Sequence, residues 1–383
     1  MQYCGHLNTM YPKYRTWLEL DSQALNYNTR KVRSFLTPKT KLCAVVKSNA
    51  YGHGLLDFSR TAKKAGVDGF CVDSAVEGLE LRRNGFQEPI IVLGATLPSL
   101  FKPAHKNNLT ISISGWEFLS ELAKSCPPLP LHLKIDTGMH RQGFAINDLP
   151  KVLNFIKNKK LNLTGFFSHL AMPNNQTFSD GQKSEFREAE NIINSYGFKN
   201  LTRHLAATGG ILLGKDYHFD LVRCGMGLYG CWEGFKPVLS WHTLISEIKN
   251  LKKGDCVGYD LTEKINRPVK AAILPIGYWH GFDRGLSKIG EVFIKNKPGS
   301  ESWTEKKIKE TSPTSTAWKP ARVLGRVSMD MIVVDVTDIN CKVGEIATLI
   351  GPKNTAVAMS KKINTSPYEV VTRINPLIQK ITK

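Results

Sequence analysis

Residues 42–54 read LCAVVKSNAYGHG. The apolar run 42–46 ends at Lys47, and a polar loop with Gly52 and Gly54 follows it directly. A short apolar run bounded by turn residues is typical of a buried strand. A lysine at the end of such a strand is unfavourable unless its charge is paired or used in chemistry. This stretch therefore predicts a buried strand that carries a lysine to the edge of its sheet.

Seven further apolar runs follow, and helix-like segments separate most of them. Strand runs that alternate with helical patterns indicate repeated βα units and a parallel sheet. Eight such units favour a (β/α)8 TIM-like barrel over an open sheet. The eight runs are 42–46, 69–72, 90–93, 110–113, 131–135, 163–167, 204–207 and 221–223.

Helix start and stop signals support this alternation. Ser74 and Glu77 follow the second run with the spacing of a capping box, and Gly85 stands where that helix should end. An opening helix over residues 22–34 is predicted to precede the first barrel strand.

The sequence pattern changes after about Trp241, where six short strand-like runs alternate with turn residues. We therefore expect an α/β protein with an N-terminal (β/α)8 barrel over residues 14–242 and a C-terminal mostly-β domain over residues 243–383. Residues 1–13 form an extra N-terminal segment, and the polar stretch 296–318 is interpreted as an insertion. The six runs are 243–248, 270–276, 290–294, 322–327, 331–336 and 346–350.

The composition excludes several classes of protein. The 383 residues are 42% hydrophobic and 22% charged, which is enough to build a full core. No stretch approaches the roughly 18 apolar residues of a membrane-spanning helix. Lys13 and Arg15 are not followed by an apolar run, so we expect no secretory signal and a cytoplasmic location. Met10 is an alternative start.

The eight cysteines include no C-x-x-C pair, and most lie in apolar runs. Buried, reduced thiols are therefore expected, with no disulfides and no metal site. The cysteines are Cys4, Cys43, Cys71, Cys126, Cys224, Cys231, Cys256 and Cys341.

The chain is basic, with 52 Lys and Arg against 33 Asp and Glu and a formal charge of +19. A basic protein can bind nucleic acid. Here the excess is spread along the chain, and the densest run, 306–309, is flanked by Glu305 and Glu310. We therefore expect no nucleic-acid partner, and the charge is compatible with anionic small ligands.

Active sites of such barrels lie at the C-terminal ends of the strands. Lys47 follows the first run there, and a desolvated lysine can form a Schiff base with a carbonyl compound. Residues 208–210 (TGG) and 224–227 (CGMG) follow the seventh and eighth runs, where this fold commonly binds phosphate. A Schiff-base lysine beside a phosphate site suggests pyridoxal phosphate. A lysine that merely extends from the barrel rim is the alternative for Lys47.

Seven motifs resemble those of the alanine racemase family and follow the family order along nearly the whole chain. They are VVKSNAYGHG at 45–54, LKIDTGMHR at 133–141, SH at 168–169, RCGM at 223–226, VGY at 257–259, PIGY at 275–278 and GRVSMD at 325–330. The resemblance implies an isomerase that uses pyridoxal 5'-phosphate to interconvert L- and D-alanine. It also implies D-alanine biosynthesis for peptidoglycan and cell wall biogenesis, and a head-to-tail homodimer with shared active sites.

The resemblance further implies two catalytic residues, because racemisation needs a proton donor and acceptor on each face of one carbon. Lys47 matches the lysine that holds the cofactor and acts on one face. Tyr259 matches a tyrosine that the partner subunit supplies on the other face. A tyrosine of pKa ~10 is a poor base near neutrality unless neighbours favour its phenolate. His169 matches the histidine that could orient it.

Further cofactor-binding and substrate-binding roles are implied in the same way. Arg223 matches the residue that faces the cofactor's pyridine nitrogen and leaves it unprotonated, because a guanidinium does not readily give up a proton. Lys134 and Arg141 match a pair in which the lysine is carbamylated and orients the arginine toward the substrate carboxylate. The phosphate-binding positions fall on Tyr51, Thr208, Gly225 and Met226.

The second domain carries the remaining matches. Met329 matches a residue whose backbone meets the substrate carboxylate, and Tyr278 matches a substrate-binding residue at the entrance. Arg284 and Arg326 also match entrance positions.

Some positions depart from the family pattern. Asn174 stands where an entrance aspartate is common, and Trp279-His280 replaces Ala-Asp. An ungapped alignment from Tyr368 places Thr382 where the family has a phosphate-contacting tyrosine. These departures leave the preferred amino acid open.

Three alternatives stay open at this point. A broad-specificity amino-acid racemase shares all these motifs. A non-catalytic carrier of pyridoxal phosphate shares the barrel but has one domain and no counterpart of Tyr259. An amino-acid decarboxylase of the same fold type carries cysteine and acidic motifs that we do not find here.

Overall fold

The computed structural model describes residues 14–125, 128–296 and 318–383. The chain forms two compact units. We call Ser22–Lys236 the barrel unit, and Pro237–Lys383 with the N-terminal residues up to Asp21 the sheet unit. Residues 1–13 with Met10, and all but the two end residues of the predicted insertion 296–318, lie outside the described residues.

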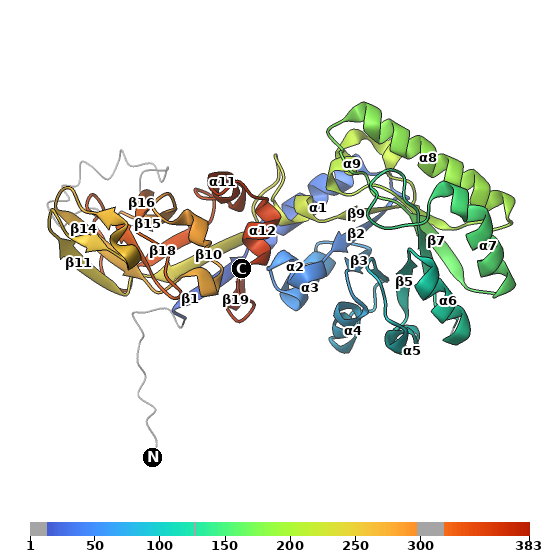
Figure 1. Ribbon diagram of the computed structural model, residues 1–383, viewed down its shortest axis with the longest axis horizontal. Helices are drawn as coiled ribbons and strands as arrows, with labels where there is room; N and C mark the ends of the chain where they lie inside the picture. The colour runs from blue at the N-terminus through green and yellow to red at the C-terminus, as the bar shows by residue number, and fades with distance from the viewer. Residues whose placement is uncertain (1–13, 126–127, 297–317) are drawn as a thin grey trace, which may run out of the picture. The chain divides into compact units, whose positions relative to one another are not determined.

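The barrel unit is built on eight parallel strands in the order β8-β7-β6-β5-β4-β3-β2-β9 (Figure 1). Several of these strands are buried at every position, as expected when helices cover one face and side chains fill the other. This arrangement confirms the predicted barrel. The strands are β2 Lys41–Val45, β3 Gly69–Val72, β4 Ile90–Val92, β5 Leu109–Ile113, β6 Leu131–Lys134, β7 Leu163–Phe167, β8 Thr202–His204 and β9 Leu221–Cys224.

The barrel is nearly closed. No ladder joins β8 to β9 among the residues that the structure describes. Two backbone hydrogen bonds cross this gap instead, from Asp220 N–H to Arg203 O (3.1 Å) and from Arg223 N–H to Ala206 O (3.0 Å). The predicted strand 204–207 is therefore displaced, since β8 ends at its first residue.

Helices lie on the outer side of these strands (Figure 1). The predicted capping box is confirmed, because Ser74 and Glu77 cap the helix that follows β3. These helices are α1 Ser22–Phe35, α3 Leu55–Lys64, α4 Ala75–Arg83, α5 Phe101–Lys106, α6 Trp116–Ser125, α7 Leu149–Asn158 and α8 Gln176–Ser195. Three short ones, α2 Lys47–Tyr51, α9 Thr208–Leu213 and α10 Met226–Tyr229, start at the C-terminal ends of strands.

The sheet unit contains a nine-stranded sheet in the order β11-β14-β17-β16-β15-β18-β10-β1-β19. Strands such as β10 alternate buried and half-buried positions, the pattern of a sheet with one face on the core. This confirms a mostly-β second domain. The strands are β1 Thr16–Leu20, β10 Leu239–Leu244, β11 Glu247–Leu251, β14 Val269–Leu274, β15 Glu291–Lys295, β16 Trp318–Leu324, β17 Ile332–Asp335, β18 Ile346–Ile350 and β19 Gln379–Thr382.

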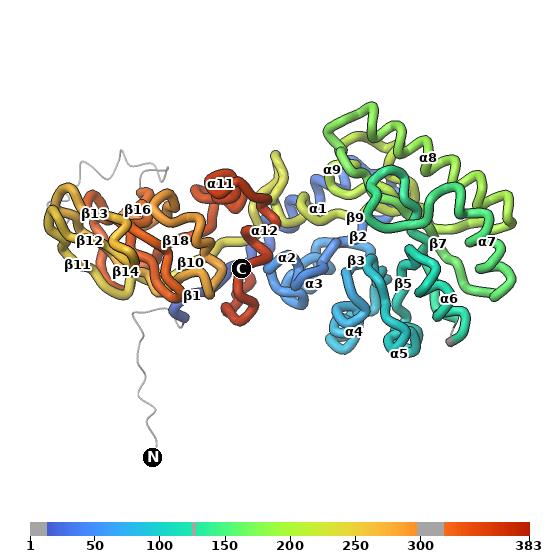
Figure 2. Tube along the Cα trace, in the orientation of Figure 1, coloured from blue at the N-terminus to red at the C-terminus, as the bar shows by residue number. Residues whose placement is uncertain are grey.

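The strand pairing differs from the sequence prediction at the unit boundary. β1, predicted within the barrel part, pairs antiparallel with β10 and parallel with β19; Figure 2 labels β1 and β10 along the chain trace. The predicted division after residue 242 falls inside β10. The predicted run 243–248 is in fact the end of β10 and the start of β11. These pairings join segments far apart in the chain, and local patterns do not encode them.

Smaller elements complete the sheet unit. A two-stranded hairpin, β12 Cys256–Val257 with β13 Glu263–Lys264, stands apart from the large sheet. The 3-10 turn η5 Tyr278–His280 follows β14. Two helices that the sequence prediction missed, α11 Ala356–Lys362 and α12 Pro367–Thr372, precede β19.

The described cysteines are free, and most are buried. Cys231 is half-buried, and Cys256 is exposed at the start of the short β12 hairpin, which the sequence prediction missed. Cys4 and Cys126 lie outside the described residues. Among the described residues, no helix is long and apolar enough to cross a membrane.

Candidate active site

The turn that carries Lys47 has a left-handed backbone. Ser48, Asn49, Ala50 and Tyr51 have φ angles of 54°, 56°, 51° and 49°. Left-handed helical geometry costs a non-glycine residue about 1–2 kcal/mol. A run of such residues persists only where the surrounding structure holds it.

Glu77 supplies much of that support. Its Oε1 accepts hydrogen bonds from the N–H groups of Ser48 (2.6 Å) and Asn49 (3.4 Å). Its Oε2 accepts from Asp73 N–H and Ser74 N–H, which is the capping interaction of α4. One carboxylate thus joins the turns after β2 and β3.

Lys47 is the first residue of this turn. Its Nζ lies 3.2 Å from Asp73 Oδ1, and its side chain is 36% exposed. The amine is therefore held at the C-terminal end of the strands, where a small molecule can reach it. This geometry is compatible with both interpretations of Lys47, the functional one and the structural role at the rim.

Arg223 on β9 is 3% exposed, and its guanidinium binds neutral groups. It donates to the carbonyls of Ser168 (2.7 Å), Leu205 (3.0 Å) and His204 (3.0 Å). It also contacts Nδ1 of His204 (2.5 Å) and of His169 (3.3 Å). Burial lowers the pKa of Arg223 to about 10, so the side chain still carries its charge at neutral pH.

The imidazoles around Arg223 are neutral. Burial, followed by the charge of Arg223, lowers the pKa of His169 to about 3 and that of His204 well below its usual range. Since Arg223 donates to His204 Nδ1, the His204 proton lies on Nε2, which is 2.8 Å from His132 Nδ1. His132, whose pKa is also lowered to about 3 by burial, therefore accepts a hydrogen bond from this N–H group and stays neutral. The motif comparison did not single out His132 or His204.

Lys134 is buried near the same charge. It ends β6 at 7% exposure, and its Nζ lies 5.0 Å from the ring centre of Phe167. Burial, followed by the charges of Arg223 and Arg141, lowers the pKa of Lys134 to about 8. At pH 7 about a tenth of such an amine is uncharged and nucleophilic. The exposed Arg141 thus lies within electrostatic range of Lys134, as the motif comparison predicted for this pair.

The turns after β8 and β9 meet beside Tyr51. Thr208 Oγ1 accepts a hydrogen bond from Gly227 N–H at 3.2 Å. A Cβ on Gly225 would lie 3.3 Å from the Tyr51 hydroxyl oxygen. The backbone of Gly225 therefore lies next to the Tyr51 hydroxyl, with the buried Met226 directly after it. Such a cradle suits an anion the size of a phosphate.

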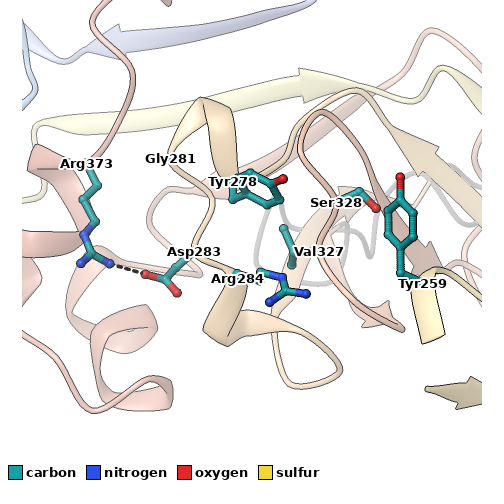
Figure 3. A pocket seen from close by; sticks show the side chains of 8 residues that line it. All are labelled: Tyr259, Tyr278, Gly281, Asp283, Arg284, Val327, Ser328 and Arg373. Carbon is teal, nitrogen blue, oxygen red and sulfur yellow. Dashed lines mark hydrogen bonds and ion pairs between the residues drawn. The ribbon is translucent and has the colours of Figure 1, made fainter. Parts of the chain in front are cut away.

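The remaining predicted site residues belong to the sheet unit. A pocket of about 540 Å³ is lined by Tyr259, Tyr278, Gly281, Asp283, Arg284, Val327, Ser328 and Arg373. Figure 3 shows Ser328 between the two tyrosines in this view, with the Arg373–Asp283 ion pair at the other end.

Tyr259 stands at the tip of a strained turn. It follows Gly258 in the β12–β13 hairpin and is 69% exposed. Asp260 and Leu261 behind it have φ angles of 58° and 49°, and Asp260 pairs with Arg326 at 2.5 Å. The hairpin therefore holds the tyrosine ring away from the core.

The structure thus gathers the predicted residues into two groups. The barrel unit holds Lys47, Tyr51, Lys134, Arg141, His169, Thr208, Arg223, Gly225 and Met226. In the sheet unit, Tyr259 and Tyr278 line one pocket, and Met329 adjoins it through the hydrogen bond from Trp279 N–H to Met329 O (3.1 Å).

The departures from the family pattern also have places in the structure. Asn174 is exposed just before α8, and Thr382 lies in β19 opposite Leu20 of β1. Trp279 is half exposed, whereas His280 is buried. No described residues form a cluster of metal ligands.

A lysine amine at a barrel mouth, a buried arginine and glycine-rich turns after β8 and β9, together with a mostly-β second domain, are typical of a two-domain barrel enzyme. Two sequence profiles identify the family of this chain. The profile for the alanine racemase N-terminal domain matches residues 20–232, and that for the alanine racemase C-terminal domain matches residues 238–382. This chain belongs to the alanine racemase family.

Individual relatives agree with the profiles. An alanine racemase of Leptospira interrogans is 32% identical over 404 residues, which cover 98% of this chain and 97% of the relative. The alanine racemase of Bacillus anthracis with bound L-Ala-P has a TM-score of 0.86 and 27% identity, covering 97% of this chain and 96% of that one. The alanine racemase of E. faecalis has a TM-score of 0.84 and 26% identity, covering 98% and 100%.

Proposed function

We propose that this chain is an alanine racemase that interconverts L- and D-alanine with pyridoxal 5'-phosphate bound at the barrel mouth. The observation that carries the proposal is the strained turn that presents the Lys47 amine beside an anion cradle and a buried arginine. The match of both family domains over nearly the whole chain supports it.

The residues of the barrel unit fit this cofactor. Lys47 would hold its aldehyde carbon, and Arg223 would donate toward the ring nitrogen from a fixed position. The phosphate would be held by Tyr51, Thr208 and the backbone of Gly225 and Met226, where any side chain at position 225 would press on Tyr51. When bound, pyridoxal phosphate withdraws electrons from the substrate's α-carbon and makes its C–H acidic.

Two groups would then move the α-proton. Lys47 Nζ would take or give it on one face, since its amine is free once the substrate amine has replaced it. The Tyr259 hydroxyl would serve the other face, supplied by the partner subunit of a homodimer. The exposure of Tyr259 on one chain supports this shared site, because a base needs a drier environment than open solvent.

Arg141 and Met329 would bind the substrate carboxylate. We propose that Lys134 is carbamylated and that the resulting anion orients Arg141. The lowered pKa of Lys134 supports this, because only an uncharged amine reacts with carbon dioxide. A carbamate would also remove one of the positive charges that lie near Arg223. Tyr278 would lie at the entrance on the substrate's path.

A broad-specificity racemase is the second candidate. Trp279, half exposed next to Tyr278, favours it, because a large side chain at the entrance can alter which amino acids enter. A non-catalytic carrier role fits less well, since the chain has the complete second domain with Tyr259.

D-Alanine formed in the cytoplasm would supply peptidoglycan synthesis.

The test is loss of the α-proton of L-alanine in heavy water with added pyridoxal phosphate, followed by chiral analysis. We expect deuterium incorporation together with D-alanine. Exchange with other amino acids but not alanine would favour the broad-specificity candidate. Bound cofactor without any exchange across an amino-acid panel would contradict the proposal.

A further inference from the structure

The turn η5 is tied directly to the loop that carries Met329. Tyr278 N–H donates to Ser328 O at 3.0 Å, and Trp279 N–H donates to Met329 O at 3.1 Å. The turn and the loop are therefore joined through their backbones. A shift in one changes the position of the other.

Gly277, just before the turn, leaves no space between these two segments. A Cβ there would lie 2.2 Å from Ser328 O and 2.3 Å from Met329 O, closer than real Cβ contacts. The backbone of Gly277 therefore packs directly on the 328–329 loop. Whatever orients the Gly277 peptide also orients Tyr278 relative to Met329.

The His280 ring is what orients this peptide. The side chain is 2% exposed, and its Nδ1 accepts the Gly277 N–H at 3.2 Å. Because the backbone N–H is the donor, Nδ1 carries no proton, and the ring proton lies on Nε2. An imidazolium has two N–H groups and no acceptor, so it cannot make this bond.

The surroundings of His280 fix the ring and disfavour its charge. Asn375 N–H donates to His280 O at 3.1 Å, and the Trp279 ring contacts the imidazole edge-on. Burial is the main cause that lowers the pKa of His280. Arg15 also lowers this pKa, whereas Asp330 raises it. The neutral ring is therefore the stable form at neutral pH.

We propose that His280 is a positioning residue of this enzyme, whose neutral ring holds the Gly277 peptide and thereby fixes Tyr278 against the Met329 loop. The inference rests on the proposed function, in which Tyr278 and Met329 meet the substrate. A carboxylate accepts the same hydrogen bond but loses its proton near pH 4, whereas an ordinary histidine titrates near pH ~6.5.

The titration of His280 predicts that KM for alanine rises at acid pH. As the pH falls through the pKa of His280, which lies below the ordinary histidine value, the acceptor is lost and the turn loosens. We expect KM for alanine to rise on this acid limb of the pH profile while kcat changes less, because the ring does not touch the reacting carbon.

The experiment uses the full-length holoenzyme and four matched chains, measured from about pH 5 to pH 8.5. His280→Asn keeps an acceptor that does not titrate, so its KM should stay flat over this range. His280→Asp should show no KM limb in this range, because a carboxyl group keeps its charge and its acceptor oxygens down to about pH 4. His280→Leu has no acceptor, so KM should rise by about tenfold at every pH, the loss expected for one buried hydrogen bond.

His242→Asn is the control, because His242 is a half-buried histidine of the sheet unit whose pKa is also lowered by burial. It should keep the wild-type KM limb. Selective ¹⁵N-histidine spectra of the wild-type chain should also show His280 as the Nε2–H tautomer, a readout independent of activity.

An active wild type whose KM limb persists unchanged in His280→Asn would overturn the inference and leave the racemase assignment intact. An Nδ1–H tautomer of His280 at neutral pH would overturn it as well. A wild-type chain without α-proton exchange at any pH would instead remove the proposed function.

Discussion

In the barrel unit, Arg223 and Lys134 are almost fully buried, and carbonyls and neutral imidazoles hold the arginine in place. In the sheet unit, Tyr259 is 69% exposed, and the neighbouring Asp260 and Arg326 pair with each other. The barrel mouth is therefore organised within one chain. Tyr259 lies on an open surface, and in the proposed mechanism a partner subunit would cover it.

In the proposed mechanism, the two units would contribute to catalysis in different ways. Buried charges in the barrel unit act in a low-dielectric environment and need no rearrangement. An exposed phenol has to gain its environment from assembly. The two bases of the proposed mechanism should therefore respond differently to mutation.

The largest effect is expected for Lys47→Ala. Activity should fall by roughly four orders of magnitude or more, because both the covalent attachment of the cofactor and one base are removed. The measurement is racemisation of alanine together with the visible absorbance of bound cofactor.

Lys41→Ala is the matched control for Lys47→Ala. Lys41 lies at the opposite end of β2 and pairs at the surface with Asp68. Its loss should leave activity unchanged. Turnover close to wild type in Lys47→Ala would contradict the assignment of the reactive amine.

Tyr259→Phe should lower racemisation by about 10²- to 10⁴-fold, the range for loss of one proton-transfer group. Cofactor absorbance should be unchanged, because no barrel residue is altered. Tyr27→Phe, on helix α1, should behave as wild type. Full racemase activity in Tyr259→Phe would place the second base elsewhere.

The buried imidazoles should make the barrel unit sensitive to acid. His132 and His169 each have a pKa of about 3 in the folded chain, against an ordinary value of about 6.5 when unfolded. The unfolded chain therefore binds more protons as the pH falls below 6.5, and stability decreases. At pH 5 this amounts to about 2 kcal/mol for each histidine.

Urea unfolding at pH 7.5 and at pH 5, followed by a signal from the barrel unit, measures this decrease in the free energy of unfolding. His132→Gln should reduce the difference between the two pH values, because one buried titrating group is gone. An equal difference in both chains would mean that His132 is not buried in its neutral form.

Glu77→Gln should have the smallest effect of this series. The glutamine keeps one oxygen as an acceptor, but its NH2 group replaces the other oxygen and faces backbone N–H groups that now donate to the carboxylate. The left-handed turn should therefore lose about 1–3 kcal/mol of stabilisation. We expect activity to fall about tenfold, with weaker cofactor binding. Glu80→Gln, on the exposed side of α4, is the control, and an equal loss in both chains would refute a specific role for Glu77.

The fold was largely predictable because its strands are short apolar runs. The runs at 69–72 and 346–350 coincide with β3 and β18. The pairing of β1 with β10 and β19 was not predictable, since it depends on contacts between distant segments. The nine-stranded sheet therefore emerged only from the structure.

The candidate site shows the same limit. Motifs identify Lys47 and Tyr259 because each stands in a distinctive local sequence. The left-handed turn that follows Lys47 has no glycine at residues 48–51, so the sequence did not predict it. The turn is stabilised by Glu77, for which the sequence predicts only a role in a helix cap. The hydrogen bond between His204 and His132 likewise joins different strands.

The most direct test of the account compares α-proton exchange from L-alanine and from D-alanine in heavy water, using the Tyr259→Phe holoenzyme. If Lys47 and Tyr259 serve opposite faces of the α-carbon, exchange from one enantiomer should persist and exchange from the other should fall at least about 100-fold. Equal residual exchange from both enantiomers would contradict the division of the two bases between the barrel unit and the sheet unit.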